Sequence, residues 1–505
     1  MKRLKSILSN EVRLLILIFI VAILIRFLYF PNNIHFAFDQ ARDAYFAQNI
    51  LKGDLRIIGP PSAAAESLFP GPLSLYLYSI VLFIKNSPIS LSAFFRIYNA
   101  LGVFLVYLIA KNILGKKTAT VTSLLYAFSY EQTQYSLFMS HQPLAVIPVL
   151  LFYLGLTHVI FRKDTRGIII SILGLGLAIQ FHYVYLLYLL ILALILLIFR
   201  KAFSKISIKY YIYALLFFFV TISSYIVAEI KFGGRFISTL MHTSARSTVY
   251  LTESLYVVRR FLHDTFFGNY SFTFILSIAL TIALIYFLTQ KRHRLVIVFL
   301  SIWFIGGLLP YLFSGTSSYY YSAGVNVSIL IFITLIITTL LQKYRYIALL
   351  IFLVVVINNL LLISRVNISG LNSDMVIQRG MLISEQIKVL DYIYITAGKN
   401  DFSVASLGVP LKINTTWSYL FEWYGYKTYG YLPIWSEKPP LGFPGNLSYK
   451  EKRSDLPLTQ YIIIEPTIGI NEGYIEKYFS EENYFSRIVE EKDFGSIAVQ
   501  KRIKI

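Results

Sequence analysis

Cysteine is absent from this chain of 505 residues. Its absence excludes disulfide bonds, thiolate metal sites and cysteine nucleophiles. Charge is scarce as well, because only 14% of the residues are Asp, Glu, Lys or Arg, whereas a soluble domain carries about 25%. Since 56% of the residues are hydrophobic, the composition excludes an ordinary soluble domain and indicates a polytopic α-helical membrane protein.

Acidic residues are fewer than basic ones, 26 against 46, and the difference lies in one part of the chain. Residues 1–363 hold 30 Lys or Arg and 10 Asp or Glu, whereas residues 364–505 hold 16 of each kind. A nucleic-acid-binding protein combines a basic patch with recognition elements, and the sequence shows none. The excess of positive charge therefore indicates membrane topology, and no nucleic acid is expected as a partner.

Eleven apolar stretches are long enough, or nearly so, to cross a bilayer about 30 Å thick. The first follows the basic segment Met1–Arg13 and has no small-residue cleavage site behind it, so we interpret it as a retained helix. The polar break at Gln180–Tyr183 divides one long apolar segment into two stretches. The expected spans are residues 14–30, 91–112, 118–136, 143–161, 167–181, 184–199, 209–230, 271–290, 295–313, 319–341 and 345–363.

The loops between these spans differ in their basic content. The short loops near residues 137–142, 182–183 and 314–318 contain no Lys or Arg. Cytoplasmic loops carry an excess of Lys and Arg, so we expect a cytoplasmic N-terminus and a multi-pass protein of the cytoplasmic (plasma) membrane. The loops expected inside hold Lys111, Lys116, Lys117, Arg162, Lys163, Arg166, Arg200, Lys201, Lys205, Lys209, Lys291, Arg292, Arg294, Lys343 and Arg345.

Three long segments then lie outside the cytoplasm. The apolar residues 72–84 are expected to form a half-embedded helix, because counting them as a span would move basic loops to the outside. The tail alternates polar and apolar clusters, so we predict a small extracytoplasmic α/β domain, residues 364–505, after a transmembrane domain, residues 1–363. The outer loops are 31–90 and 231–270, and the expected tail elements are strands 402–407, 461–464 and 496–499 and a helix at 415–426.

Polar residues within the expected spans gather at the outer ends. Lipid does not solvate such groups, so they mark functional sites. A channel or carrier places polar groups through the full depth of the bilayer, and many transporters show inverted internal repeats; the sequence shows neither pattern. The distribution indicates a site at the outer interface, where a membrane-held substrate meets one from outside. The polar residues concerned are Arg26, Arg96, Glu131, Gln132, Gln134, His141, Gln142, Gln180, His182 and Glu229.

Three charges, Asp39, Arg42 and Asp43, follow closely on the first span. Their spacing of three and four residues places them on one face of a helix. Together with Gly59-Pro60 and Phe69-Pro70-Gly71-Pro72, they resemble the first outer loop of the GT-C glycosyltransferases. The resemblance is greatest to the bacterial branch related to lipid A aminoarabinose transferase and protein O-mannosyltransferase, and it implies a GT-C-like fold.

The resemblance implies that Asp39 is the catalytic acid of the outer loop, acting as a general base on the acceptor, a role that contributes about 10²–10⁴-fold. Asp39 could instead only cap the helix that begins there, and Asp43 could assist Asp39 or only pair with Arg42. Relatives carry a second acid where this chain has His141-Gln142-Pro143. Because Gln142 takes the place of that acid, His141 becomes a candidate base or ligand, or else a solvated interfacial histidine.

The remaining candidates concern the donor and the acceptor. Gln142, Gln180 and His182 are assigned to the acceptor side, although the Gln180–Tyr183 turn could merely cap adjoining helices. Guanidinium groups suit phosphate, with contacts to solvent or lipid headgroups as the alternative. The resemblance implies that a Tyr at the outer start of the tenth span contacts the carrier phosphate, with an aromatic belt as the alternative. The donor-binding candidates are Arg42, Arg246, Arg259, Arg260, Tyr320 and Tyr321.

A metal site is implied by the resemblance alone. Glu66 and His242 lie near the positions of a metal-binding Glu and His in relatives, which makes a divalent ion, Zn²⁺, Mg²⁺ or Mn²⁺, a candidate cofactor. Two His and a carboxylate can hold Zn²⁺, but a His-x-x-x-His spacing is absent from the sequence. Metal dependence therefore stays open at this point.

These features lead to one hypothesis with three alternatives, one of which is a structural or receptor role for the tail with an inactive membrane part. The chain is expected to be an inverting hexosyl- or pentosyltransferase that moves a sugar from a polyprenyl-phosphate carrier to an extracytoplasmic lipid, glycan or protein acceptor, among membrane lipids. An O-antigen ligase or polymerase type of enzyme would instead depend on Arg and His in a late outer loop. A lipid-linked substrate transporter or flippase would carry midplane charges and pseudo-symmetric halves.

Overall fold

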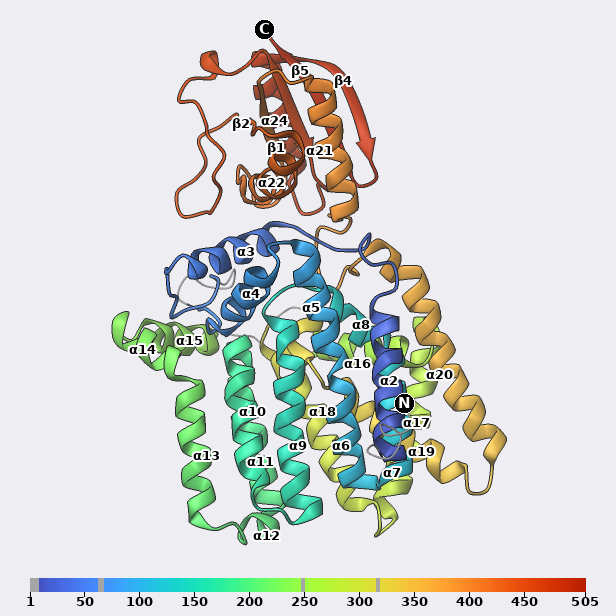
Figure 1. Ribbon diagram of the computed structural model, residues 1–505. Helices are drawn as coiled ribbons and strands as arrows, with labels where there is room; N and C mark the ends of the chain where they lie inside the picture. Colours follow the sequence, from blue (N-terminus) through green and yellow to red (C-terminus); the bar gives the residue numbers. More distant parts are fainter. Residues whose placement is uncertain (1–8, 62–67, 247–249, 315–317) are drawn as a thin grey trace.

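The computed structural model describes residues 9–61, 68–246, 250–314 and 318–505. A bundle of long helices forms one part of the molecule, and a smaller α/β domain is stacked on one end of it (Figure 1). The N-terminal helix lies within the bundle, and the C-terminus lies at the far end of the α/β domain (Figure 1). The two parts meet at helix α3, which carries the charged group identified in the sequence.

The bundle is built from helices rich in Leu, Ile, Val and Phe. Within the described residues, five helical segments are long and apolar enough to cross a membrane, and the pair α13–α14, bent by 53°, would be a sixth. Four further apolar helices, α4, η2–α11, α10 and α19, are shorter. The bundle helices are α2 (Asn10–Arg26), α5 (Pro88–Ala100), α6 (Gly102–Leu114), α7 (Lys116–Phe128), α8 (Tyr130–Leu137), η1 (Gln142–Ala145), α9 (Val146–Arg162), α10 (Gly167–Phe181), η2 (Tyr183–Leu187), α11 (Tyr188–Ile198), α12 (Arg200–Phe203), α13 (Ile208–Thr221), α14 (Ser223–Lys231), η3 (Tyr270–Phe272), α17 (Thr273–Thr289), α18 (Arg294–Ser314), η4 (Tyr319–Ser322), α19 (Asn326–Leu340), α20 (Arg345–Val366) and η5 (Asn367–Ser369).

These elements agree with a polytopic membrane protein, whereas the number of eleven spans stays a prediction. Several expected spans are interrupted in the structure. The span expected at 118–136 is divided at Ser129, whose side chain caps α8 by accepting a hydrogen bond from the Gln132 amide. The span expected at 319–341 begins as the 3₁₀ turn η4, and its α-helix starts only at Asn326.

Buried arginines tie together the ends of the first helices that face the C-terminal domain. Arg26 Nε donates to Asn99 Oδ1 at 2.8 Å, and Arg96 Nη2 donates to Asn33 Oδ1 at 2.8 Å. Arg96 also donates to the backbone carbonyl of Arg26. A buried charge is tolerated only when it is well paired with hydrogen-bonding groups, so these arginines, which the sequence placed at outer ends, have structural partners.

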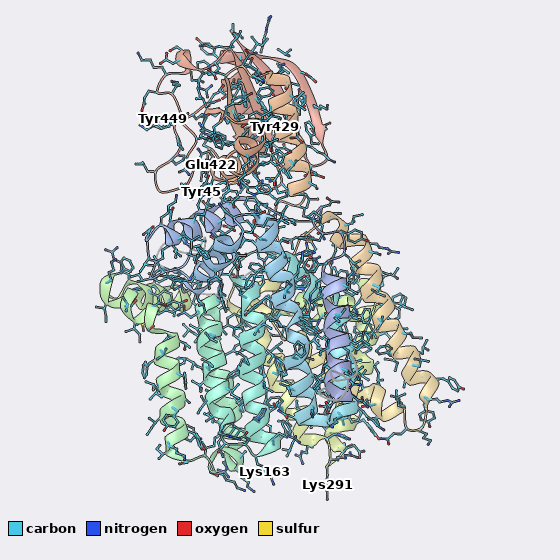
Figure 2. The ribbon with its side chains drawn as sticks, viewed as in Figure 1. Tyr45, Lys163, Lys291, Glu422, Tyr429 and Tyr449 are labelled. Atoms are coloured by element: carbon cyan, nitrogen blue, oxygen red, sulfur yellow. The ribbon has the colours of Figure 1, made fainter. Side chains whose placement is uncertain are left out.

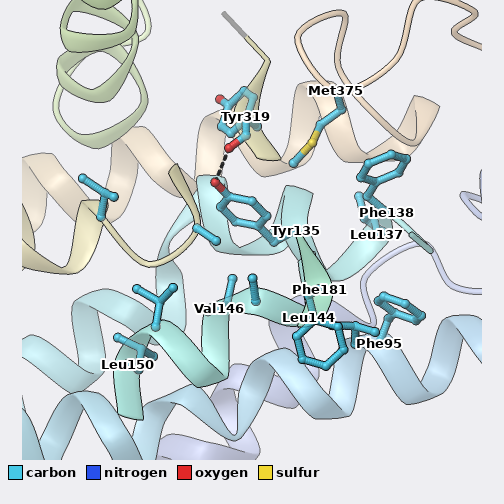
Figure 3. Packing of buried hydrophobic residues seen from close by; sticks show 14 of the residues in the cluster. Phe95, Tyr135, Leu137, Phe138, Leu144, Val146, Leu150, Phe181, Tyr319 and Met375 are labelled. Carbon is cyan, nitrogen blue, oxygen red and sulfur yellow. Dashed lines mark hydrogen bonds between the residues drawn. The ribbon is translucent and has the colours of Figure 1, made fainter. Parts of the chain in front are cut away.

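The core beneath the outer end is apolar and continuous. Figure 3 shows Phe95, Leu144 and Phe181 packed together from three different helices. Met375, from the segment after α20, lies beside Phe138 (Figure 3). The chain leaving the last bundle helix therefore returns into the bundle before it enters the C-terminal domain.

Short helices cover the end of the bundle that faces the C-terminal domain (Figure 1). A helix is present at the expected position, as α4, and its half-embedded placement stays a prediction. The apolar side chains of Phe46 and Ile50 on α3 pack against Leu75 on α4. These outer helices are α3 (Phe38–Leu51), α4 (Leu73–Ile84), α15 (Arg235–Arg246) and α16 (Leu251–Thr265).

The C-terminal domain is a five-stranded sheet in the order β2-β1-β3-β5-β4. Strand β1 pairs in parallel with β2 and β3, and the last three strands are antiparallel. The strand expected at 402–407 is β1, and the other two expected strands fall on β3 and β5. The elements are α21 (Ile383–Ala397), β1 (Phe402–Leu407), α22 (Thr415–Leu420), the π-turn η6 (Phe421–Gly425), α23 (Tyr426–Tyr429), β2 (Ile434–Trp435), η7 (Arg453–Asp455), β3 (Thr459–Ile464), α24 (Glu472–Phe485), β4 (Ser486–Phe494) and β5 (Ile497–Lys504).

Candidate functional site

Helix α3 presents Asp39 at its first turn. The helix begins after Ala37, whose amide donates to Gln40 Oε1 at 3.1 Å. Asp39 lies in the first turn of the helix, where the helix dipole interacts favourably with an acidic side chain. The Asp39 side chain is 53% exposed, and its Oδ1 lies 2.8 Å from Arg42 Nη1. Asp39 is therefore a solvent-accessible carboxylate that is paired with Arg42.

Arg42 lies between two carboxylates. Its Nη2 is 2.8 Å from Asp43 Oδ1, and its Nε donates to the same oxygen at 2.9 Å. Asp43 is 1% exposed, and burial raises its pKa to about 6, although the adjacent Arg42 charge opposes that rise. The guanidinium thus joins an exposed acid to a buried one, as the shared helix face predicted.

Two histidine rings lie next to each other at the same end of the bundle. The rings of His141 and His182 are stacked with centroids 5.8 Å apart and 10° between their planes. The amide of Val184 donates to His182 Nδ1 at 3.1 Å, so the neutral tautomer of His182 carries its proton on Nε2. Burial lowers the pKa of His182 to about 3 and that of His141 well below its usual range. Both rings are therefore neutral at physiological pH.

The histidine pair and α3 belong to one site. Gln40 Nε2 donates to the Met139 carbonyl at 3.0 Å, which ties the first turn of α3 to the turn that carries His141. The charge of Arg42 is close enough to contribute to the lowered pKa of His141. The structure therefore brings Asp39, Arg42, Asp43, His141 and His182 together, although 102 and 143 residues separate Asp39 from the two histidines.

The two glutamines assigned to the acceptor side have partners within the protein. Gln142 Oε1 accepts a hydrogen bond from Ser140 Oγ in the His141 turn. Gln180 Nε2 donates to the Thr221 carbonyl at 2.7 Å and to Ser224 Oγ at 2.9 Å. Gln180 therefore holds α10 against α13 and α14, and its role toward an acceptor stays a prediction.

The donor-binding candidates do not all meet at the histidines. The ring of Tyr321 lies 5.5 Å from that of His182. Arg260 is buried and stacks on Tyr319 with its guanidinium carbon 4.0 Å from the ring centroid. Arg259 is exposed and lies 5.4 Å from the Tyr270 ring. The side chains of Arg246 and Tyr320 lie outside the described part of the structure.

A second polar cluster surrounds Arg260, and sequence reasoning missed most of it. Tyr319 O–H donates to Asp264 Oδ2, and Tyr256 O–H donates to Asp374 Oδ1 at 3.2 Å. Arg260 Nη2 is 3.5 Å from Tyr311 O–H. The only sequence signal was that Asp264 is one of ten acids in the first 363 residues. The cluster joins α16 to the outer end of α18 and to the segment after α20.

An apolar cavity of about 250 Å³ lies against the other face of α16, the face that carries Val258 and Leu262. It lies between α16, α17, α18 and α19. Its walls include Leu262, Leu280 and Phe304, with Phe332 from α19. Such a cavity accommodates a hydrocarbon chain, because its lining offers few polar groups that would have to be desolvated.

Glu66 and His242 are the two residues that the resemblance implies as metal ligands. Glu66 lies outside the described residues. His242 is exposed and lines an open hollow with Glu229, whose Oε1 accepts a hydrogen bond from the Ile237 amide at 3.2 Å. No group of three or more His, Asp or Glu side chains that could hold a metal ion occurs among the residues described. We therefore derive no step through a metal.

Comparisons with known proteins bear on the fold. Residues 70–227 match the family model for dolichyl-phosphate-mannose-protein mannosyltransferase, and no curated protein sequence matches the chain. The structure is similar to ArnT from Cupriavidus metallidurans bound to undecaprenyl phosphate, with TM-score 0.62, 10% identity, and coverage of 96% of this chain and 97% of that one. It is also similar to AglB from Archaeoglobus fulgidus in complex with an inhibitory peptide and a dolichol-phosphate, with TM-score 0.55, 13% identity, and coverage of 94% and 72%.

A third similar structure is the Archaeoglobus fulgidus oligosaccharyltransferase in complex with Zn and sulfate, with TM-score 0.51, 14% identity, and coverage of 81% of this chain and 60% of that one. These similarities confirm the predicted resemblance to the GT-C glycosyltransferases. The chain has a GT-C-like helical fold with a small C-terminal sheet.

Proposed function

We propose that this chain with a GT-C-like fold is a glycosyltransferase of the cytoplasmic membrane. It moves a sugar from a polyprenyl-phosphate carrier to an acceptor on the side of the C-terminal domain, and Asp39 is its general base. One observation carries the proposal: a half-exposed carboxylate, Asp39, lies at the junction of the bundle and the C-terminal domain, paired with Arg42 beside two neutral histidines.

The proposed reaction is a single displacement at the anomeric carbon. Asp39 takes the proton from the acceptor hydroxyl or amine, the freed electron pair forms the new bond to that carbon, and the bond to the carrier phosphate breaks. The configuration is inverted because the acceptor attacks from the face opposite the phosphate. General-base assistance of this kind is worth about 10²–10⁴-fold in rate.

The proposed donor follows from charge and from shape. The departing phosphate needs positive charge or hydrogen-bond donors to stabilise it, and Arg42 and Tyr321 lie at the site. The apolar cavity between α16, α17, α18 and α19 suits the hydrocarbon tail of a carrier. Two similar structures contain undecaprenyl phosphate and a dolichol-phosphate, which supports a polyprenyl or dolichyl carrier here.

The proposal is tested by incubating purified protein in nanodiscs with a panel of radiolabelled polyprenyl-phosphate sugars and candidate acceptors. Wild-type protein should transfer label from one donor, and Asp39→Asn should lower the rate by about 10²-fold or more, because the base is removed. Asp54→Asn is the matched control, since Asp54 is 60% exposed and pairs with Arg56 at 3.7 Å in the same outer loop.

Full turnover in Asp39→Asn would contradict the role of Asp39. A parallel series with EDTA and added Zn²⁺, Mg²⁺ or Mn²⁺ tests the implied metal. Loss of turnover with EDTA, and its recovery with one ion, would establish metal dependence. If Asp39→Asn and Asp54→Asn lose activity equally, the loss reflects damage to the outer loop and does not identify a base.

A further inference from the structure

We infer that the C-terminal domain positions the catalytic helix α3, and that the hydrogen bond between Tyr45 and Glu422 is the device that does so. The inference rests on the proposed function, because it concerns how Asp39 is aimed at its substrate. The structure supports it with two separate contacts, one before Asp39 in the chain and one after it.

The first contact fixes the start of α3. The Phe36 amide donates to the Met381 carbonyl at 2.8 Å, and the Ile383 amide donates to the Ile34 carbonyl at 2.9 Å. Gln386 on α21 adds a third bond, from Nε2 to the Phe36 carbonyl at 2.7 Å. The backbone that enters α3 is thus paired with the backbone that enters α21 of the C-terminal domain.

The second contact fixes the middle of α3. Tyr45 is 3% exposed, and its O–H lies 3.0 Å from Glu422 Oε1 and 3.2 Å from Ser418 Oγ. The other carboxylate oxygen, Glu422 Oε2, accepts from Asn446 Nδ2 at 3.2 Å. Figure 2 shows Tyr45 and Glu422 close together where the two parts of the molecule meet. Glu422 stands in the π-turn η6, a distortion that is frequent at functional sites.

The spacing of residues on α3 shows what this contact controls. Phe38 and Tyr45 are seven residues apart and share a helix face, and both contact the C-terminal domain. The Phe38 ring lies 5.8 Å from Phe443, and the Tyr45 ring lies 5.4 Å from Tyr419. Two fixed points on one face set the rotation of the helix about its axis.

Rotation of α3 decides where its acids point. Asp39 lies one residue after Phe38, so it projects from the side of the fixed face. A turn of the helix would move Asp39 sideways, together with its partner Arg42 on the same helix. A misplacement of about 1 Å at a reacting group can cost about 10²-fold in rate. Tyr45 and Glu422 are accordingly positioning residues, and neither touches the reacting atoms.

The test compares Tyr45→Phe with Tyr429→Phe. Tyr45→Phe keeps the aromatic ring against Tyr419 and removes only the hydroxyl that binds Glu422. Tyr429 O–H donates to Asp391 Oδ1 at 2.8 Å within the C-terminal domain, so its loss removes a similar bond away from α3. We expect Tyr45→Phe to lower kcat about 10-fold with unchanged donor affinity, and Tyr429→Phe to leave kcat unchanged.

Variants of Glu422 provide a second test of the inference. Glu422→Ala should lower kcat as Tyr45→Phe does, whereas Glu422→Gln should recover most of it, because the amide oxygen can still accept from Tyr45. The double variant Tyr45→Phe with Glu422→Ala should have a kcat no lower than that of the slower single variant. Two substitutions that break the same bond do not have additive effects. Additive losses in the double variant would overturn the inference.

Hydrogen exchange gives a readout that does not depend on turnover. The amides of α3 should exchange faster in Tyr45→Phe than in wild type and Tyr429→Phe, since the clamp on that helix is weakened. If wild type transfers sugar and Tyr45→Phe keeps its kcat, the positioning role is wrong while the proposed function stands. If wild type transfers no sugar from any donor, the proposed function fails, and unchanged exchange in α3 would independently exclude the clamp.

Discussion

At the scale of single residues, the buried position of Asp43 gives the site a pH dependence. Its pKa is raised to about 6 by burial, so Asp43 is neutral below that pH and negative above it. Among the residues that the structure describes, the neutral form leaves Arg42 with Asp39 as its only carboxylate partner. We expect kcat to rise between about pH 5 and pH 7 with an inflection near 6, and Asp43→Asn to remove that inflection. An unchanged profile in Asp43→Asn would show that another group titrates.

Glu465, in the C-terminal domain, makes a residue-scale prediction about stability. It is 6% exposed and accepts from Trp417 Nε1 at 2.9 Å, and burial raises its pKa from 4.5 to about 7. A raised pKa means that its stabilising contribution is complete below pH 4.5 and is lost as the pH rises through 7. The loss amounts to about 3 kcal/mol at most.

Glu465→Gln should therefore flatten the pH dependence of unfolding, because an amide cannot ionise. Thermal unfolding of the purified protein at pH 5 and pH 8 measures this directly. The wild type should lose more Tm between the two pH values than Glu465→Gln does. Equal losses would contradict the raised pKa of Glu465.

Contacts between residues could be predicted from the sequence only where the two partners are close in the chain. The spacing of Asp39, Arg42 and Asp43 predicted a shared face, and the structure shows both ion pairs. The stacking of His141 on His182 joins two separate turns, and no local pattern encodes it. The same holds for Tyr319 and Asp264, which are 55 residues apart and meet only after the bundle has formed.

At the scale of elements, α9 and α10 depend on small residues at their contact. A Cβ added at Gly174 would lie 2.4 Å from the Phe152 amide nitrogen, and one at Gly155 would lie 2.3 Å from that of Ser171. Small residues allow such close backbone approach between helices in membranes. The two helices must separate if either glycine gains a side chain, because backbone atoms cannot give way.

Gly174→Ala should therefore destabilise the bundle by about 1–3 kcal/mol, seen as a lower Tm in detergent. The matched control is Gly306→Ala on α18, where the added Cβ meets only the flexible side chain of Ile191. The control should retain more of the wild-type Tm. Equal effects of the two substitutions would contradict the close α9–α10 contact as the cause.

Sequence patterns predicted the elements whose side chains are uniformly buried or whose ends are marked by a polar break. The break at Gln180–Tyr183 is present, because α10 ends at Phe181 and the 3₁₀ turn η2 begins at Tyr183. Strand β1 is fully buried, and its bounds in the structure are those predicted from the sequence. Strand β4 was missed because it lies at the sheet edge and is largely exposed and charged, as edge strands often are.

At the scale of the whole molecule, charge predicts the orientation in the membrane. Lys163 and Lys291 lie at the end of the bundle opposite Tyr449 and the C-terminal domain (Figure 2). Because the chain has no cysteine, single cysteines report on sidedness without background. In intact cells, Lys450→Cys should react with a membrane-impermeant maleimide, and Lys291→Cys should react only after lysis. Labelling of Lys291→Cys in intact cells would reverse the predicted topology.

The layout of the molecule was more predictable than its site, because hydropathy and loop charge act over many residues. A helical bundle, a helix near residues 72–84 and a small C-terminal sheet all followed from the sequence. The contact of α3 with the C-terminal domain did not, since Tyr45 and Glu422 are 377 residues apart. Such contacts depend on how two folded parts fit together, which no local pattern records.

The most direct test of sugar transfer at Asp39 uses proteoliposomes in which the C-terminal domain faces outward, with labelled polyprenyl-phosphate sugar and acceptor supplied from outside. We predict release of the carrier phosphate together with labelled acceptor by wild type, and loss of both in Asp39→Asn but not in Asp54→Asn. Transfer that continues undiminished in Asp39→Asn, or that occurs only when donor and acceptor are enclosed within the liposomes, would contradict catalysis by Asp39 at the outer interface.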